Sequence, residues 1–229
     1  MIHQIAFTHP KPGMSEKDFQ DYWKKVHAIE YASKVSQIKR YMIASRIPFG
    51  PELEDPLWSG VAEIWMENEE EQIASLQSKE FLEGARRDEP KWSAFWRTVV
   101  LDTTTHTILK GLPLEKDPRM VKLFILTKRK AGMSLEDFRR QMLERHASNV
   151  LKLSGLRRYL QCHVRDSSYA VGETTFDCVS QLWFDDIEAL EKVYNSSEYQ
   201  NEVKPDFAVL FEPKYIHTMV TDETWIIGP

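Results

Sequence analysis

Two histidines, His27 and His146, are the residues of this sequence best suited to proton chemistry near neutral pH. An imidazole titrates in that range and can both accept and donate a proton. Asp88 and Asp206 are carboxylates that could orient or charge-balance these histidines, or act as bases themselves. We predict His27, His146 and Asp88 as catalytic residues and Asp206 as a substrate-binding residue. The alternative for each histidine is a helix-end side chain bonded to a carbonyl.

A second candidate set is two Arg-Tyr pairs, Arg40-Tyr41 and Arg158-Tyr159. A phenol can hydrogen-bond a substrate carbonyl or enolate, so we predict Tyr41 as a catalytic residue. We predict Arg40, Tyr159 and Arg158 as substrate-binding residues. Neighbouring strand residues point to opposite faces, so only one member of each pair can face a cavity, and an anionic substrate would favour the arginine.

The sequence contains seven tryptophans. Clefts lined by aromatic side chains suit planar ligands, so Trp23 and Trp65 are predicted to bind substrate. The alternative is an ordinary core position for both, as for Trp183.

The elements that must position these residues occur twice. Gly13-Met14-Ser15 recurs 119 residues later as Gly132-Met133-Ser134, and Arg40-Tyr41 recurs 118 residues later as Arg158-Tyr159. A period this long is too large for a solenoid repeat and indicates two tandem domains. We predict domains at 1–110 and 120–229, with 111–119 as a linker rich in Gly, Pro and charge.

Each copy reads as strand, helix, strand, strand, helix, strand. The predicted strands are 2–8, 38–47, 60–66 and 98–101, then 121–127, 156–164, 176–184 and 214–220, with short edge pieces at 104–109 and 224–227. Ser15 and Ser134, each three residues before an aspartate, predict the starts of the first helices.

This order is the ferredoxin-like pattern of an antiparallel sheet covered on one face by two helices. The other sheet face needs a partner, which the second copy can supply. The predicted fold class is therefore α+β, with two tandem ferredoxin-like (βαββαβ) domains that form a fused α+β barrel, a pseudo-dimer.

Several ordered motifs resemble those of EthD-type domains. In the first copy these are the lead Lys11-Pro12-Gly13-Met14-Ser15, the helix Phe19 to Ala28 with Trp23 and His27, Arg40-Tyr41, Ala62-Glu63-Ile64-Trp65 and Asp88-Glu89. The second copy retains Phe138, His146-Ala147, Arg158-Tyr159, Gln181-Leu182-Trp183-Phe184 and Asp206, but has Met142 for the tryptophan and Phe207 after the aspartate. The resemblance implies the dimeric α+β barrel superfamily, which includes cofactor-free isomerases, cyclases, dehydratases and monooxygenases as well as haem enzymes. The first copy is the more complete match.

Composition narrows the function classes further. The 229 residues carry a net charge of −5 and are 42% hydrophobic, with two cysteines in no metal or redox spacing. No basic stripe predicts nucleic-acid binding, and no apolar run or leader pattern predicts a membrane partner or secretion. A cytoplasmic protein is the expectation. Nucleotide-binding, hydrolase and metal motifs are missing from the sequence, so we predict no cofactor and no metal.

We predict a cofactor-independent enzyme that moves a proton by general acid/base catalysis, of isomerase, dehydratase or cyclase type. Its substrate would be a small unsaturated or aromatic-derived acid or ketone, in aromatic-compound catabolism. The alternatives are a cofactor-free or haem-dependent monooxygenase, and a non-catalytic ligand-binding or stress-type accessory protein. The expected state is a monomeric pseudo-dimer or a homodimer.

Overall fold

The computed structural model describes residues 1–51, 55–111 and 120–228. They form two units: residues 1–103 with 221–228, and residues 104–111 with 120–220. The predicted linker 111–119 lies outside the described residues, apart from Gly111. The units depart from a division into 1–110 and 120–229, because residues 104–110 group with the second half and residues 221–228 with the first.

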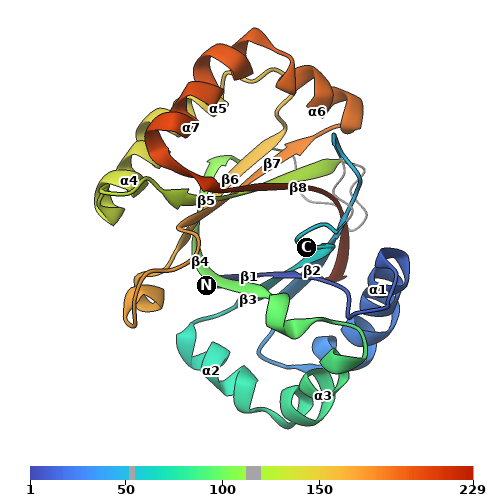
Figure 1. Ribbon diagram of the computed structural model, residues 1–229. Helices are drawn as coiled ribbons and strands as arrows, with labels where there is room; N and C mark the ends of the chain where they lie inside the picture. Colours follow the sequence, from blue (N-terminus) through green and yellow to red (C-terminus); the bar gives the residue numbers. More distant parts are fainter. Residues whose placement is uncertain (52–54, 112–119, 229) are drawn as a thin grey trace. The chain divides into compact units, whose positions relative to one another are not determined.

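The first unit has the predicted order of elements, and Figure 1 shows its helices on one side of its sheet. Its strands follow the order β4-β1-β3-β2, with the end of β8 beside β2. The elements are β1 (Ile2–Thr8), α1 (Glu16–Tyr22), the π-helix η1 (Trp23–Tyr31), η2 (Ala32–Lys34), β2 (Arg40–Arg46), β3 (Gly60–Met66), α2 (Glu69–Gln77), the π-helix η3 (Glu80–Ala85), α3 (Arg86–Asp88), η4 (Glu89–Lys91), η5 (Phe95–Arg97) and β4 (Val99–Leu109).

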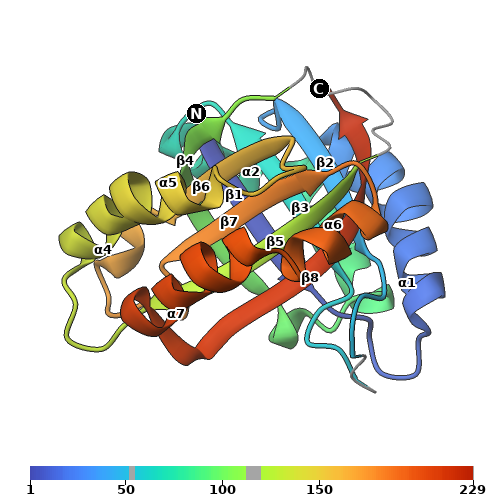
Figure 2. The ribbon, with the colours of Figure 1, turned by 90° about the horizontal axis from the view of Figure 1, so that it is seen from above.

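The second unit repeats this order, with strands arranged β8-β5-β7-β6 followed by β4. Figure 2 looks onto its helical layer, which lies over β5 and β7. The elements are β5 (Val121–Arg129), α4 (Leu135–Gln141), the π-helix η6 (Met142–His146), α5 (Ala147–Val150), β6 (Arg158–Val164), η7 (Asp166–Tyr169), β7 (Cys178–Phe184), α6 (Ile187–Tyr194), the π-helix η8 (Tyr199–Val203), α7 (Lys204–Leu210) and β8 (Phe211–Ile227).

Two strands, β4 and β8, are longer than the sequence predicted. The sequence predicted a strand at 98–101 with a separate edge piece at 104–109, but β4 is one strand of 11 residues. Likewise β8 is one strand of 17 residues rather than a strand at 214–220 and a piece at 224–227. Each strand contributes residues to both units. Alternating side chains continue across both supposed breaks, and no Gly or Pro interrupts them, so nothing ends the strand there.

The predicted serine caps are confirmed. The Ser15 hydroxyl accepts a hydrogen bond from the Asp18 backbone N–H at 3.1 Å, and Ser134 accepts from Asp137 at 3.0 Å. These bonds satisfy backbone donors that the first helical turn leaves free. Both helices then pass into π-helical turns, η1 and η6, which in proteins often mark functional sites.

Candidate functional site

The helix α1 and the π-helix η1 that continues it present one buried face to the sheet of the first unit. Phe19, Trp23 and His27 follow one another at intervals of four residues and are 0%, 3% and 6% exposed. Trp92 packs against all three rings, with centroid distances of 4.6 to 5.3 Å. The helix therefore holds the His27 imidazole in an aromatic layer, where its orientation is restricted.

His27 and Asp88 form a buried pair. Nδ1 of His27 lies 2.9 Å from Oδ2 of Asp88, and the two side chains are 7% and 1% exposed. Because a carboxylate can only accept, this bond places the imidazole proton on Nδ1. The lone pair of a neutral His27 is then on Nε2, the geometry of an oriented general base. The structure thus brings together two of the predicted catalytic residues.

Asp88 receives further donors on its other oxygen. The Tyr22 hydroxyl donates to Oδ1 at 2.9 Å, and the Lys91 ammonium lies at the same distance. Burial on its own would raise the pKa of the Asp88 carboxyl, but the bonds from Lys91, His27 and Tyr22 outweigh it and hold the pKa below its ordinary value. Asp88 is therefore ionised at neutral pH and stabilises a positive charge that forms on His27.

Burial has the larger effect on His27 itself. It lowers the pKa of the imidazole, although the hydrogen bond and charge of Asp88 act in the opposite direction. His27 is accordingly neutral at pH 7 and able to accept a proton. Within the described part of the chain, no hydrogen-bonding group meets Nε2, and the side chain lines a cavity.

That cavity, of about 300 Å³, lies in the first unit between the helices and the sheet. Its walls are mostly apolar and aromatic, with strand residues such as Ala6, Ala62 and Ile64 on one side and helix residues on the other. The volume is at the lower end for ligand sites, which are typically about 300–1,000 Å³. A small ligand in it would touch His27 directly.

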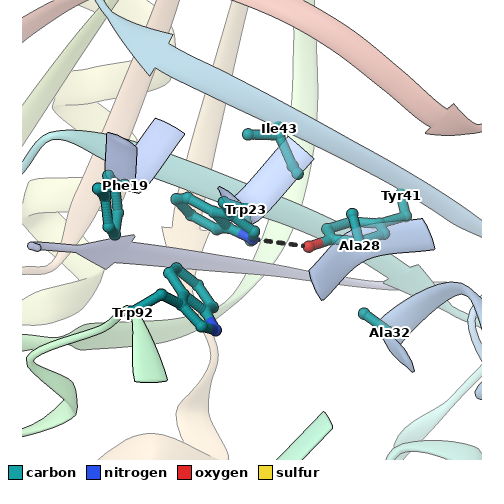
Figure 3. Packing of buried hydrophobic residues seen from close by; sticks show 8 residues of the cluster. Phe19, Trp23, Ala28, Ala32, Tyr41, Ile43 and Trp92 are labelled. Carbon is teal, nitrogen blue, oxygen red and sulfur yellow. Dashed lines mark hydrogen bonds between the residues drawn. The ribbon is translucent and has the colours of Figure 1, made fainter. Parts of the chain in front are cut away.

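Tyr41 reaches the same cavity from β2. Its hydroxyl accepts a hydrogen bond from Nε1 of Trp23 at 3.0 Å, drawn as a dashed line in Figure 3. Burial raises the pKa of the Tyr41 phenol, so it keeps its proton. Among the described residues that proton has no acceptor. Tyr41 can therefore donate to a ligand, while Trp23 fixes the position of its oxygen.

Glu89 is a cavity residue that the predicted site did not include. Its side chain is 14% exposed and lies 2.5 Å from Nη1 of Arg86. Burial raises the pKa of the Glu89 carboxyl, and Arg86 opposes the rise in part. The pair Asp88-Glu89 in the sequence could have pointed to this residue. The glutamate was left out of the predicted site because the second copy has Asp206-Phe207 instead.

Arg40 and Trp65 lie on the other face of the sheet. They are paired across β2 and β3, as Tyr41 is paired with Ile64 one position along. Trp65 stacks on His3 at 4.3 Å and on Trp225 at 5.5 Å rather than lining the cavity. The structure does not bring these two residues to His27, and a role for them in substrate binding stays a prediction.

The second unit contains a matching pair. Nδ1 of His146 lies 3.0 Å from Oδ2 of Asp206, which also accepts from Nδ2 of Asn149 at 3.0 Å. Burial would raise the pKa of Asp206, but the bonds from His146 and Asn149 and the charge of Arg145 hold it below its ordinary value. The dyad geometry has thus been kept in both copies.

The surroundings of the second dyad differ. Phe207 and Phe211 pack on the His146 ring at 6.2 and 5.5 Å, where the first copy has Glu89 and Ser93. Met142 takes the place of Trp23 and belongs to the same apolar cluster as Phe211. Side chains of this size fill space beside the imidazole, which is 3% exposed.

Tyr159 is also held differently from Tyr41. Its hydroxyl accepts from Nε2 of Gln161 at 2.7 Å, so a strand amide replaces the tryptophan donor. Arg158 lies on the opposite strand face, with its guanidinium 5.6 Å from the ring of Trp183. Both pairs confirm that the tyrosine and the arginine of each Arg-Tyr pair point to opposite faces.

Within the described residues there is no group of three or more His, Cys, Asp or Glu placed to hold a metal ion. No described helix has both the length and the apolar character required to cross a bilayer.

The fold defines a mixed α+β protein built from two copies of one domain. The EthD domain model matches residues 11–95 and again residues 130–214, which together are more than half of the chain. The chain belongs to the EthD domain family and carries two tandem copies.

Solved structures with similar folds have diverse names. An anthrone oxidase-like protein is 13% identical with a TM-score of 0.65, covering 98% of this chain and 92% of its own. A "putative monooxygenase" from Fusobacterium nucleatum subsp. nucleatum is 8% identical with a TM-score of 0.63, covering 97% and 91%. A mutant chlorite dismutase from Candidatus Nitrospira defluvii is 8% identical with a TM-score of 0.52, covering 98% and 92%. At these identities the likeness establishes the fold alone. A comparison with curated proteins found no match.

Proposed function

We propose that this protein is a cofactor-independent enzyme that removes a proton from the carbon next to a carbonyl group. Its substrate is a small unsaturated or aromatic-derived ketone or acid, and the reaction is an isomerisation, dehydration or cyclisation. The observation that carries the proposal is the buried His27–Asp88 pair, whose imidazole is bonded through Nδ1 and lines an apolar cavity. The names of the structural neighbours, which include an oxidase-like protein, agree with an enzyme but specify no such reaction.

The proposed step uses three side chains. Nε2 of His27 takes the α-proton, the C–H electron pair forms a carbon–carbon double bond, and the carbonyl oxygen becomes an enolate. The Tyr41 hydroxyl donates a hydrogen bond to that oxygen, and the Asp88 carboxylate stabilises the imidazolium. Return of the proton to another carbon of a conjugated system gives an isomer. If a hydroxyl group on the β-carbon leaves instead, taking the proton from His27, the products are an alkene and water.

Proton exchange tests this step without knowledge of the natural substrate. In D₂O, ¹H NMR would follow loss of the α-proton signal of 2-tetralone in the presence of the protein. His27→Asn should slow the catalysed exchange by about 10²–10⁴-fold. His9→Asn is the matched control, because His9 lies outside the cavity of His27.

Three results would contradict the proposal or favour an alternative. A wild-type rate in His27→Asn would remove the histidine from the mechanism. Binding of the ketone without exchange by either protein would favour the non-catalytic accessory protein. A Soret band in the purified protein would favour the haem-dependent monooxygenase. The fused barrel of the two copies, and a monomer or homodimer as the assembled state, stay predictions that light scattering and an experimental structure can test.

A further inference from the structure

We infer that the cavity of the first unit selects neutral carbonyl compounds and that Glu89 excludes carboxylates from it. This inference deepens the proposed function, since it separates the two substrate classes left open there. Glu89 would be a specificity-determining residue rather than a part of the proton transfer.

The charges at the cavity wall are of one sign. The titratable side chains that line it are His27, Tyr41 and Glu89, and no Lys or Arg is among the described lining residues. Tyr41 keeps its proton and His27 is neutral for the reasons given above. A carboxylate that entered would lose its hydration without meeting a cation, which is strongly unfavourable in an apolar site.

The cations paired with Glu89 and Asp88 are largely exposed to solvent. Arg86 is paired with Glu89, but its side chain is 47% exposed, and its guanidinium lies 4.4 Å from the centre of the Phe95 ring. Lys91 is 58% exposed and is paired with Asp88. The two acids, at 14% and 1% exposure, are therefore the buried members of both ion pairs. Because screening by solvent weakens the exposed charges more than the buried ones, a ligand in the cavity meets a net negative potential.

The remaining features of the cavity suit a flat, neutral ligand. Trp23, Trp92 and Phe95 provide aromatic walls, and the Tyr41 hydroxyl offers one donor that a carbonyl oxygen can accept. In the second copy Phe207 stands at the position of Glu89, where it packs on His146. In the first copy the acid at this position lines the cavity, and in the second copy an aromatic ring takes its place.

A matched pair of ligands tests the inference. 2-Acetylnaphthalene and 2-naphthoate share one ring system and differ in whether the substituent is a ketone or a carboxylate. Isothermal titration calorimetry of the full chain at pH 7.5 should show the ketone binding at least about tenfold more tightly than the carboxylate. Glu89→Gln should reduce that ratio at least about threefold by improving naphthoate binding. Glu83→Gln, an exposed acid on η3 whose side chain is 56% exposed, should leave the ratio unchanged.

Removal of Glu89 also leaves Arg86 without its partner, which could attract naphthoate by itself. The substitution is therefore repeated in an Arg86→Gln background, where the same reduction of the ratio is expected. Arg86→Gln alone should weaken naphthoate binding further. Equal binding of the two ligands by the wild type, failure of the ketone to bind, or an unchanged ratio in Glu89→Gln with Arg86→Gln would each overturn the inference. Selective binding without α-proton exchange would overturn the proposed reaction and leave the selectivity standing.

Discussion

Nδ1 of His27 lies 2.9 Å from Oδ2 of Asp88, and Nδ1 of His146 lies 3.0 Å from Oδ2 of Asp206. The same pair thus occurs twice in different surroundings: His27 lines an aromatic cavity, whereas Phe207 and Phe211 pack on His146. The difference between these two copies provides matched controls for experiments on the first.

Asp88→Asn should slow the catalysed α-proton exchange by about 10²–10⁴-fold, because an amide cannot stabilise the imidazolium and can invert the tautomer of His27. Asp206→Asn is the control, and exchange by this variant should stay within about twofold of the wild type. NMR exchange assays check both. A comparable loss in the two variants would show that stability or the second copy, rather than the dyad of the first, determines the rate.

The exchange rate should depend on pH through His27. The reaction needs the neutral imidazole, and burial lowers its pKa from 6.5. The rate should therefore be constant at and above pH 7 and fall on acidification with a midpoint below 6.5. A midpoint above 6.5 would mean that the charge of Asp88, and not burial, dominates the titration.

The stability of the folded protein should also decrease on acidification. His27 has a lowered pKa in the folded protein, so its contribution is present above pH 6.5 and is lost as pH falls through the folded value. Asp88 and Asp206 also have lowered values, so their contributions are present above 3.8 and are lost on further acidification. Thermal unfolding from pH 7 to pH 3 should show a decreasing Tm, with a smaller decrease between pH 7 and pH 5 in His27→Asn.

Tyr41→Phe should reduce the exchange rate by about 10²–10³-fold if its hydroxyl stabilises the enolate. It also removes the acceptor of the Trp23 N–H, a loss that costs about 1–3 kcal/mol of unfolding free energy. Tyr159→Phe removes the equivalent acceptor from Gln161, so it should destabilise by a similar amount but leave the rate unchanged. Denaturant unfolding and the exchange assay separate the two effects, and equal rates in wild type and Tyr41→Phe would refute the catalytic role.

His146→Asn should retain the exchange activity within about twofold while lowering stability. The imidazole is enclosed by Phe207 and Phe211, and its loss removes a donor from the buried Asp206 at a cost of about 1–3 kcal/mol. Parallel assays of His27→Asn and His146→Asn measure the contrast. A large loss of activity in His146→Asn, at a temperature where the variant is folded, would make the second copy a catalytic site.

Much of the fold could be predicted from the sequence, because the same local signals for helices and strands occur in both copies. The serine caps at Ser15 and Ser134, the strand at 60–66 and the order of elements appear twice in the sequence and twice in the structure. The lengths of β4 and β8 were predicted too short, although no Gly or Pro ends either strand at the predicted break. A strand continues while its backbone has a neighbour to pair with, and the partners of residues 221–227 lie on β2, far away in sequence.

The candidate site could be predicted from the sequence in part. The spacing of Trp23 and His27 placed both on one helix face, and the alternation of Arg40 and Tyr41 predicted that only one would reach the cavity. Trp65 was assigned to binding because aromatic residues suit both a pocket and a core, and residue type alone does not distinguish them. Glu89 was passed over because the second copy has Phe207 at its position, and its burial and its pairing with Arg86 become visible only in the folded chain.

The pairing of β2 with residues 221–227 also affects the order in which the protein can fold during synthesis. A ribosome completes residues 1–103 long before it reaches the segment that covers the free edge of β2. Until then that edge presents unpaired N–H and C=O groups, which other chains can pair with. The nascent first half is thus exposed to misassociation for the time needed to translate the second. A pulse-labelled truncation that ends before residue 221 should aggregate or bind chaperones more than the full chain does.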